Sequence, residues 1–193
     1  MRVFLTSDTH FSHNNILLFS NRPFKNTKEM NKALIRNWNR VVEPNDLVIH
    51  LGDVSFDEGK LSSLIYKLNG SKVLVRGNHD RKSINYYLDN GFNFASDFFV
   101  WKNDVFTHIP VKHTIKEMFR FNFHGHMHKH SEHFGIKDGY VNLAVELNEY
   151  TPVLLSSLVK QYKNLIRKEL QGVQWKVNPL FYDYGIEFHQ EAV

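Results

Sequence analysis

The stretch RVFLTSDTH, residues 2–10, passes from a short apolar run directly into an aspartate and a histidine. Two later stretches have the same form, because residues 46–53 read DLVIHLGD and residues 72–80 read KVLVRGNHD. Short runs rich in Val, Leu and Ile that stop at polar or glycine-containing residues are typical of buried strands. We therefore predict strands at Arg2–Ser7, Asp46–Leu51 and Lys72–Arg76.

Helical patterns fill the connections between these strands. Asn26 is a candidate N-cap, and Glu29 stands three positions later, as at many helix starts. The apolar residues that follow recur at helical spacing, at Met30, Leu34, Ile35, Trp38 and Val41. A second helix is predicted to start at Asp57 and to end before the turn at Asn69 and Gly70. It would bury Leu61, Leu64, Ile65 and Leu68. The first half thus has the order β-α-β-α-β.

The second half begins after Gly91 and contains several short apolar runs. We expect strands at Phe98–Trp101, Val105–His108, Arg120–His124 and Tyr140–Val145. A helix is expected from Ser156 to about Leu170, since apolar residues recur there at helical spacing. The aromatic stretch from Val173 to Phe188 fits an added hairpin or a dimer contact, and we favour the hairpin. We expect one domain over residues 1–193, in which 171–193 form a C-terminal extension of open role.

Composition narrows the class of protein. The chain has 193 residues, which suits one globular domain, and it has no cysteine, which excludes disulfides and thiolate metal sites. No apolar run is long enough for a membrane span, and we expect a cytoplasmic protein. Lys and Arg number 24 against 20 Asp and Glu, a mild bias toward anionic partners. The 12 histidines are the unusual feature, because histidine is the commonest metal ligand.

Polar residues cluster where the predicted strands end. In open α/β sheets, ligands bind at the carboxyl ends of the strands, so segments that follow different strands converge on one crevice. Each segment alone fits an ordinary turn or helix cap. Together, their order and spacing favour a shared site over chance. The set comprises Asp8, His10, Gly52, Asp53, Gly77, Asn78, His79, Asp80, His108, Gly125, His126 and His128.

This set resembles the calcineurin-like metallophosphoesterase superfamily, whose motifs are all present. The wider context at residues 7–16, 22–24 and 50–54 is similar to a small bacterial and phage branch of phosphoesterases. The resemblance covers residues 2–155. It implies an α/β fold, a four-layer α/β/β/α sandwich of two mixed sheets. The alternation of strands and helices supports the α/β class independently, whereas the four layers come only from the resemblance.

The resemblance also implies a ligand set for two divalent metal ions. One ion would take Asp8, His10 and His128, the other would take Asn78, His108 and His126, and Asp53 would bridge them. Oxygen and nitrogen ligands of this kind suit Mn²⁺, our first expectation, with Fe, Zn or Ni as alternatives. The catalytic residues would be His79, which assists the leaving group, and Asp80, which would fix the orientation and tautomer of the His79 ring.

The net charge of the expected two-metal site indicates the kind of substrate. Two divalent cations outweigh two carboxylates, so the site keeps a positive charge that favours a phosphate ester. Two metals can activate a bridging water and clamp an in-line displacement, so no nucleophilic side chain is required. We expect hydrolysis of a phosphodiester, of nucleotide or nucleic-acid type, through attack by a metal-bridging hydroxide. The alternatives are a phosphomonoesterase or protein phosphatase, and a non-catalytic binding protein on the same fold. The oligomeric state is left open.

Other polar residues have weaker assignments. We name His13, Asn14 and Arg81 as candidates for substrate binding, against a loop hydrogen bond or a solvated basic rim. His50 is expected to be a buried histidine beside the site, and Trp38 and Phe24 are expected in the core. Exposed loop positions are expected for His124, His130 and His133. Three residues lie on loops that are candidates to overhang the crevice, namely Arg22, Lys112 and His113.

Overall fold

The first sheet carries the three strands that the sequence predicts. In the computed structural model, which describes residues 1–111, 119–129 and 139–161, its strand order is β4-β3-β2-β1-β9. Strands β1 to β4 are parallel, and β9 pairs antiparallel with β1. The strands are β1 (Val3–Thr6), β2 (Leu47–His50), β3 (Ser71–Val75), β4 (Phe94–Ser96) and β9 (Val153–Leu154).

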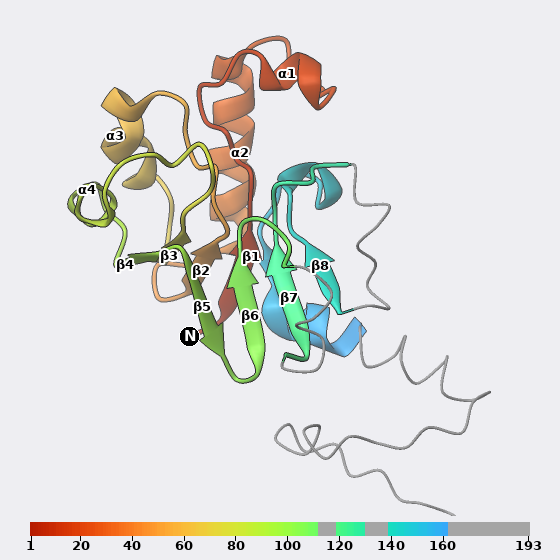
Figure 1. The fold of residues 1–193 in the computed structure, drawn as a ribbon. Coiled ribbons are helices and arrows are strands. Elements are labelled where there is room, and N and C mark those ends of the chain that lie inside the picture. The colour runs from red at the N-terminus through yellow and green to blue at the C-terminus, as the bar shows by residue number, and fades with distance from the viewer. Residues whose placement is uncertain (112–118, 130–138, 162–193) are drawn as a thin grey trace, which may run out of the picture.

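The second sheet packs against one face of the first and has the order β5-β6-β7-β8 (Figure 1). Its first pair is antiparallel and the other two pairs are parallel. The strands are β5 (Phe98–Trp101), β6 (Asp104–Thr107), β7 (Phe121–His124) and β8 (Tyr140–Asn142). The expectation of an α/β fold with two mixed sheets is therefore confirmed.

Helix α2 (Thr27–Val41) begins as the sequence predicts, because the Asn26 side chain accepts a hydrogen bond from the Glu29 backbone N–H at 2.9 Å. The second predicted helix is shorter, with a 3-10 turn at Glu58–Lys60 followed by α3 (Leu61–Ile65). Two short helices, α1 (Ile16–Phe19) and α4 (Ile84–Asp89), were not predicted. A further 3-10 turn spans Val145–Leu147. Residues 155–161 are helical, and the predicted continuation to Leu170 and the aromatic tail lie outside the described residues.

Two cores form because successive side chains of a strand point to opposite faces of its sheet. Phe4 of β1 joins the core between the first sheet and helices α2, α3 and α4, whereas its neighbour Leu5 joins the core between the two sheets. The same alternation separates Val48 from Ile49 in β2. Burial on both faces explains why these strands are continuously apolar. No helix within the described ranges is long and apolar enough to cross a membrane.

Candidate metal centre

The loops after β1, β2 and β3 meet at one edge of the first sheet, since these strands are parallel. Backbone hydrogen bonds link the loops, from the Asp8 N–H to the Gly52 carbonyl at 2.9 Å and from the His10 N–H to the Asp53 carbonyl at 3.0 Å. The loop after β7 joins them, because the His126 N–H donates to both carboxylate oxygens of Asp8, at 3.1 and 3.0 Å. Residues far apart in the chain are thus held in one cluster.

The backbone at this edge is strained. Five members of the predicted ligand set have positive φ angles, a conformation that costs free energy for any residue other than glycine and that concentrates at functional sites. The angles range from 44° to 67°, at Asp8, His10, Asp53, His126 and His128. Since packing and hydrogen bonds must offset this cost, the loops are held in place rather than left to relax.

Three glycines of the motifs permit the close approach of these loops. A Cβ at Gly52 would lie 2.6 Å from the Gly77 nitrogen, and Gly52 itself has a φ of 97°. A Cβ at Gly77 would overlap the Asp53 carboxylate, and one at Gly125 would overlap the Ser7 and Asp8 side chains. A side chain at any of these positions would therefore push the loops apart.

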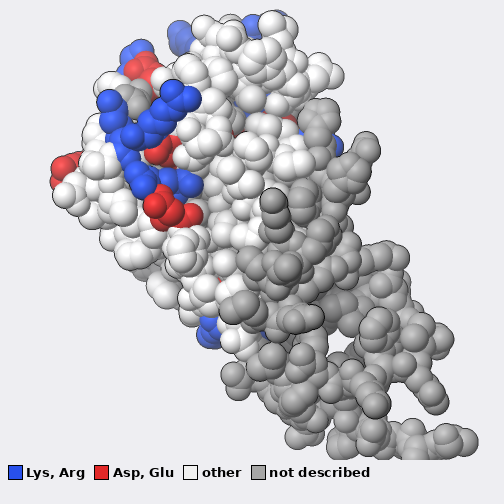
Figure 2. Space-filling model, viewed as in Figure 1, with Lys and Arg blue, Asp and Glu red and all other residues white. Residues whose placement is uncertain are grey.

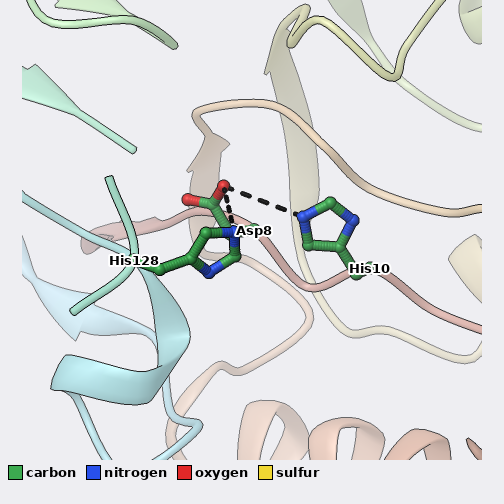
Figure 3. A group of neighbouring side chains, drawn as sticks. All are labelled: Asp8, His10 and His128. Atoms are coloured by element: carbon green, nitrogen blue, oxygen red, sulfur yellow. Dashed lines mark ion pairs between the residues drawn. The ribbon is translucent and has the colours of Figure 1, made fainter. Parts of the chain in front are cut away.

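Asp8, His10 and His128 form the first group of candidate ligands. The Asp8 carboxylate points between the two rings, with Oδ1 at 4.0 Å from Nε2 of His10 and 3.9 Å from Nε2 of His128 (Figure 3). The two imidazole rings stack with centroids 5.4 Å apart. One potential ligand atom from each residue lies within 4.8 Å of the others, a spacing that a single metal ion can bridge.

Asp53 joins this group to a second one. Its Oδ2 lies 3.5 Å from Nε2 of His10 and 3.4 Å from Nε2 of His108. Oδ1 of Asn78 is 3.0 Å from Nε2 of His108 and 3.0 Å from Nδ1 of His126. The structure therefore brings all seven predicted ligands together, with the Asp53 carboxylate between the two groups.

The hydrogen bonding of the histidines fits a metal centre. Both ring nitrogens of His10 are buried and have no hydrogen-bond partner in the described part of the chain, an arrangement that costs free energy unless another group satisfies them. His108 donates from Nδ1 to the Leu51 carbonyl at 2.7 Å, which orients the ring so that Nε2 faces Asp53. Imidazole nitrogens and carboxylate oxygens gathered in this way form a donor set that suits a divalent transition metal.

The pKa values of the candidate ligands also favour a cation at this site. Burial would raise the pKa of Asp53, but the hydrogen bond and charge of His108, together with His10, hold that pKa well below its usual range. Burial would lower the pKa of His108, but Asp53 and Asp8 outweigh it and raise the pKa to about 9. Burial also raises the pKa of Asp8. A proton on His108 thus neutralises the paired carboxylates where a cation would otherwise do so.

The comparisons with known proteins decide the family. The family model for calcineurin-like phosphoesterases matches residues 1–174. The chain belongs to this family. It is similar to an uncharacterized protein of Methanocaldococcus jannaschii, with 36% identity over 171 residues, 82% of this chain and 90% of that protein.

Two solved structures also resemble this chain. A protein of unknown function from Aquifex aeolicus has a TM-score of 0.67 and 27% identity, and the match covers 83% of this chain and 98% of the other. The nuclease MPE from Pseudomonas putida matches with a TM-score of 0.46 and 21% identity, over 66% of this chain and 62% of the other.

His79 lies at the edge of the cluster of candidate ligands. Its backbone N–H donates to Oδ1 of Asp53 at 2.9 Å, and its half-buried ring lies 5.5 Å from the ring of His10, centroid to centroid. The imidazole is therefore next to the candidate ligands, and its backbone helps to orient the bridging carboxylate.

Asp80 has a different place from the one expected. Its carboxylate accepts hydrogen bonds from the backbone N–H groups of Asp53 at 2.7 Å, Gly77 at 2.8 Å and Val54 at 3.1 Å. Among the described residues, none of its hydrogen bonds comes from the His79 ring, because the tight turn directs Asp80 inward. Burial raises its pKa to about 6. Asp80 thus ties together two loops that carry candidate ligands.

The three candidates for substrate binding differ in their surroundings. His13 is buried and stacks on Phe56, with centroids 4.0 Å apart and an interplanar angle of 6°. Arg81 is exposed beside the Asn78 turn. Asn14 is also exposed, and no hydrogen bond within the described ranges links it to the ligand cluster. Of the three, His13 therefore has the most fixed position.

Figure 2 shows Lys and Arg side chains gathered on the side of the molecule near α3 and α4, with acidic side chains among them. Arg76, directly after β3, forms an ion pair with Asp97 at 2.6 Å. The positive charge of Arg76 is therefore partly balanced within the chain.

Sequence reasoning missed Glu146, which lies in the 3-10 turn after β8. Its Oε1 accepts a hydrogen bond from Nδ1 of His128 at 3.0 Å and pairs with Nη2 of Arg22 at 2.6 Å. The hydrogen bond from His128 and the charge of Arg22 outweigh burial and lower the Glu146 pKa to about 2. A carboxylate behind a ligating histidine fixes the tautomer that leaves the other ring nitrogen free. The signal in the sequence was one acidic residue inside the apolar run LAVEL.

Arg22 was expected on a loop that might overhang the crevice, and this expectation is wrong. Its side chain is fully buried, and its guanidinium donates to the backbone carbonyls of Asp8 at 2.6 Å and Thr9 at 2.9 Å. These hydrogen bonds from Arg22 therefore help to hold the strained loop after β1 in place. The other two residues named with it, Lys112 and His113, lie outside the described residues.

The remaining histidines confirm one expectation and correct another. His50 is buried, accepts from the Gly52 N–H at 3.1 Å and contacts the Thr9 hydroxyl at 3.0 Å. His124 was expected on an exposed rim, but it is fully buried because it belongs to β7, and its Nδ1 bonds to the Gly125 carbonyl at 2.9 Å. His130 and His133 lie outside the described residues. Trp38 and Phe24 pack in or against the core as predicted.

Proposed function

We propose that the chain is a metal-dependent hydrolase of phosphate esters that uses two divalent ions, with phosphodiesters of nucleotide or nucleic-acid type as substrates. The observation that carries this proposal is the pair of candidate ligand groups joined by Asp53, together with the two ring nitrogens of His10, which have no hydrogen-bond partner among the described residues. A buried, strained and incompletely hydrogen-bonded cluster is costly for a protein that does not bind a cation there.

The predicted roles of the ligands agree with the geometry. Asp8, His10 and His128 would hold one ion, and Asn78, His108 and His126 would hold the other, with Asp53 facing both. When bound, two divalent ions activate water and polarise the phosphoryl oxygens. We favour Mn²⁺, because the set contains only nitrogen and oxygen donors, and Fe, Zn and Ni remain alternatives.

His79 is our candidate for assisting the leaving group. Its ring is half-buried beside His10 and therefore close to where the cluster would hold a phosphate. A protonated imidazole at this position donates a proton to the leaving oxygen as the ester bond breaks. Asp80 supports this step indirectly, because its hydrogen bonds hold the backbone on both sides of the site.

The substitution His79→Ala tests this assignment. We expect turnover of bis-p-nitrophenyl phosphate to fall by about 10²–10⁴-fold, the usual contribution of general acid–base catalysis. Metal content, measured on the same samples by elemental analysis, should be unchanged, since no candidate ligand is removed. Unchanged turnover with intact metal content would refute the role of His79.

A further inference from the structure

A groove of about 590 Å³ runs between α2 and α3, and Ser12, in the loop after β1, is among its lining residues. Five cationic side chains line it, three from α2 and two from residues that flank α3, and none of the lining residues among the described side chains is acidic. The cationic residues are Lys28, Lys32, Arg36, Lys60 and Lys67. The groove therefore differs from the surface around Arg76, where acidic side chains balance the charge.

Most of the charges in this groove have no ion-pair partner among the described residues. Lys28, Lys32 and Arg36 follow one another at intervals of four residues on α2, and like charges at this spacing destabilise a helix. Lys60 forms an ion pair with Asp57 at 2.7 Å. Within the described part of the chain, no carboxylate pairs with the other four cations. An anionic partner would remove this repulsion.

The spacing of the charges matches an extended polyanion. Residues four apart on a helix are separated by about 6 Å along its axis, which is comparable to the separation of neighbouring phosphates along a nucleic-acid strand. A concave surface lined on both sides by cations suits such a strand better than a flat membrane surface. Because the contacts would be to phosphates, binding would depend strongly on salt.

Ser12 lines the groove and lies two residues after the candidate ligand His10 in the sequence, so one end of the groove is near the loop that carries His10. Two hydrogen bonds of 3.0 Å join Ser12 to Asn31 of α2. Phe56 stacks on the ring of His13, the residue after Ser12, and leaves 53% of its surface exposed, with its ring centroid 5.7 Å from that of His79. An exposed aromatic ring at this point offers a stacking surface to a planar group beside the proposed leaving-group acid.

We propose that this groove binds the sugar–phosphate backbone of a single nucleic-acid strand, with one base stacked on Phe56. This inference rests on the proposed function, because it names the substrate class of the same site. A cationic groove that follows the backbone, combined with an aromatic surface for a base, is the usual arrangement in proteins that bind single strands. A base in a duplex is already stacked on its neighbours, so the exposed ring favours the single strand.

The test is fluorescence anisotropy of a labelled single-stranded oligonucleotide with the full chain, in chelator so that no hydrolysis occurs. The variant Lys32→Gln/Arg36→Gln is compared with Lys102→Gln/Lys160→Gln, which removes the same charge outside the groove. We expect at least tenfold weaker binding for the groove variant only. The slope of the logarithm of the binding constant against the logarithm of the salt concentration should also become less steep by about 1.4, since each single-strand phosphate contact contributes about 0.7 to that slope. Equal weakening in both variants would overturn the proposal.

Two further arms keep this test separate from the proposed function. Hydrolysis of bis-p-nitrophenyl phosphate with Mn²⁺ should be unchanged in both charge variants, because the small substrate does not reach the groove. If the wild type does not hydrolyse this compound but binds the strand through the groove, the result contradicts the proposed function and supports strand binding by the groove. Tighter binding to duplex DNA, or to vesicles of anionic lipid, than to the single strand would overturn the assignment of the partner.

Phe56→Leu tests the stacking step. We expect the variant to bind oligothymidylate at least fivefold more weakly, since stacking of one base contributes upward of about 1 kcal/mol. Binding of an abasic oligonucleotide of equal length should not change, because only the base contacts the ring. Equal loss for both oligonucleotides would refute the stacking role.

Discussion

Glu146→Ala removes one partner of a fully buried ion pair and leaves the Arg22 guanidinium without a counter-charge. Breaking a buried pair in this way costs about 3–5 kcal/mol. Arg22 keeps its hydrogen bonds to the carbonyls of Asp8 and Thr9, so we expect the lower half of that range. For a chain of this length, each kcal/mol lowers the melting temperature by about 2–4 °C, which predicts a decrease of roughly 6–16 °C.

The assay is thermal and urea unfolding in chelator, which keeps metal binding out of the comparison. A double variant, Arg22→Met/Glu146→Leu, tests the reasoning more closely than the single variant. Because it removes both charges, its loss of unfolding free energy should be smaller than the sum of the losses in Arg22→Met and Glu146→Leu by at least about 1 kcal/mol. A loss below about 1 kcal/mol for Glu146→Ala, or additive losses, would refute the view that this pair supports the site.

Two other predictions concern the loops. Burial lowers the pKa of His50 to about 3, so His50 is neutral in the folded chain. In the unfolded chain it takes up a proton below about pH 6.5. The free energy of unfolding therefore decreases by about 1.4 kcal/mol per pH unit as the pH falls from 6.5 toward 3. In urea unfolding, the free energy of unfolding of His50→Asn should therefore decrease less steeply with falling pH than that of the wild type. Equal slopes for the two proteins would contradict this. Gly125→Ala should weaken Mn²⁺ binding, measured by calorimetry, because its Cβ would overlap the Asp8 carboxylate. Gly59→Ala, where a Cβ meets only an ordinary contact at 3.5 Å, is the matched control and should bind like the wild type.

The parts of the fold that could be predicted are those in which local pattern and tertiary packing agree. Helix α2 has a cap at Asn26 and a helical apolar stripe, and it forms with the predicted start. The β-α-β-α-β order follows from apolar runs long enough to recognise. By contrast, β4, β9, α1 and α4 contain only two to six residues each, and their pairing or packing partners determine them more than their own sequence does.

The site follows the same division. The clustering of the candidate ligands could be predicted because they follow strands whose carboxyl ends meet at one edge of a sheet, whereas their assignment to two metal ions came from the family resemblance. The pairing of Arg22 with Glu146 joins residues 124 positions apart, and neither residue belongs to a motif that signals the other. The inward direction of Asp80 depends on the turn geometry at Gly77, which the order of residue types does not specify.

The most direct test of the proposed function is hydrolysis of bis-p-nitrophenyl phosphate and p-nitrophenyl phosphate by metal-stripped protein restored with Mn²⁺. Asp53→Asn is the control, because its carboxylate faces both candidate ligand groups. We predict metal-dependent release that disappears in Asp53→Asn, with the diester cleaved faster than the monoester. No release from either compound by protein that has bound Mn²⁺, or equal release by the variant, would contradict a hydrolase that uses these residues to hold two metals.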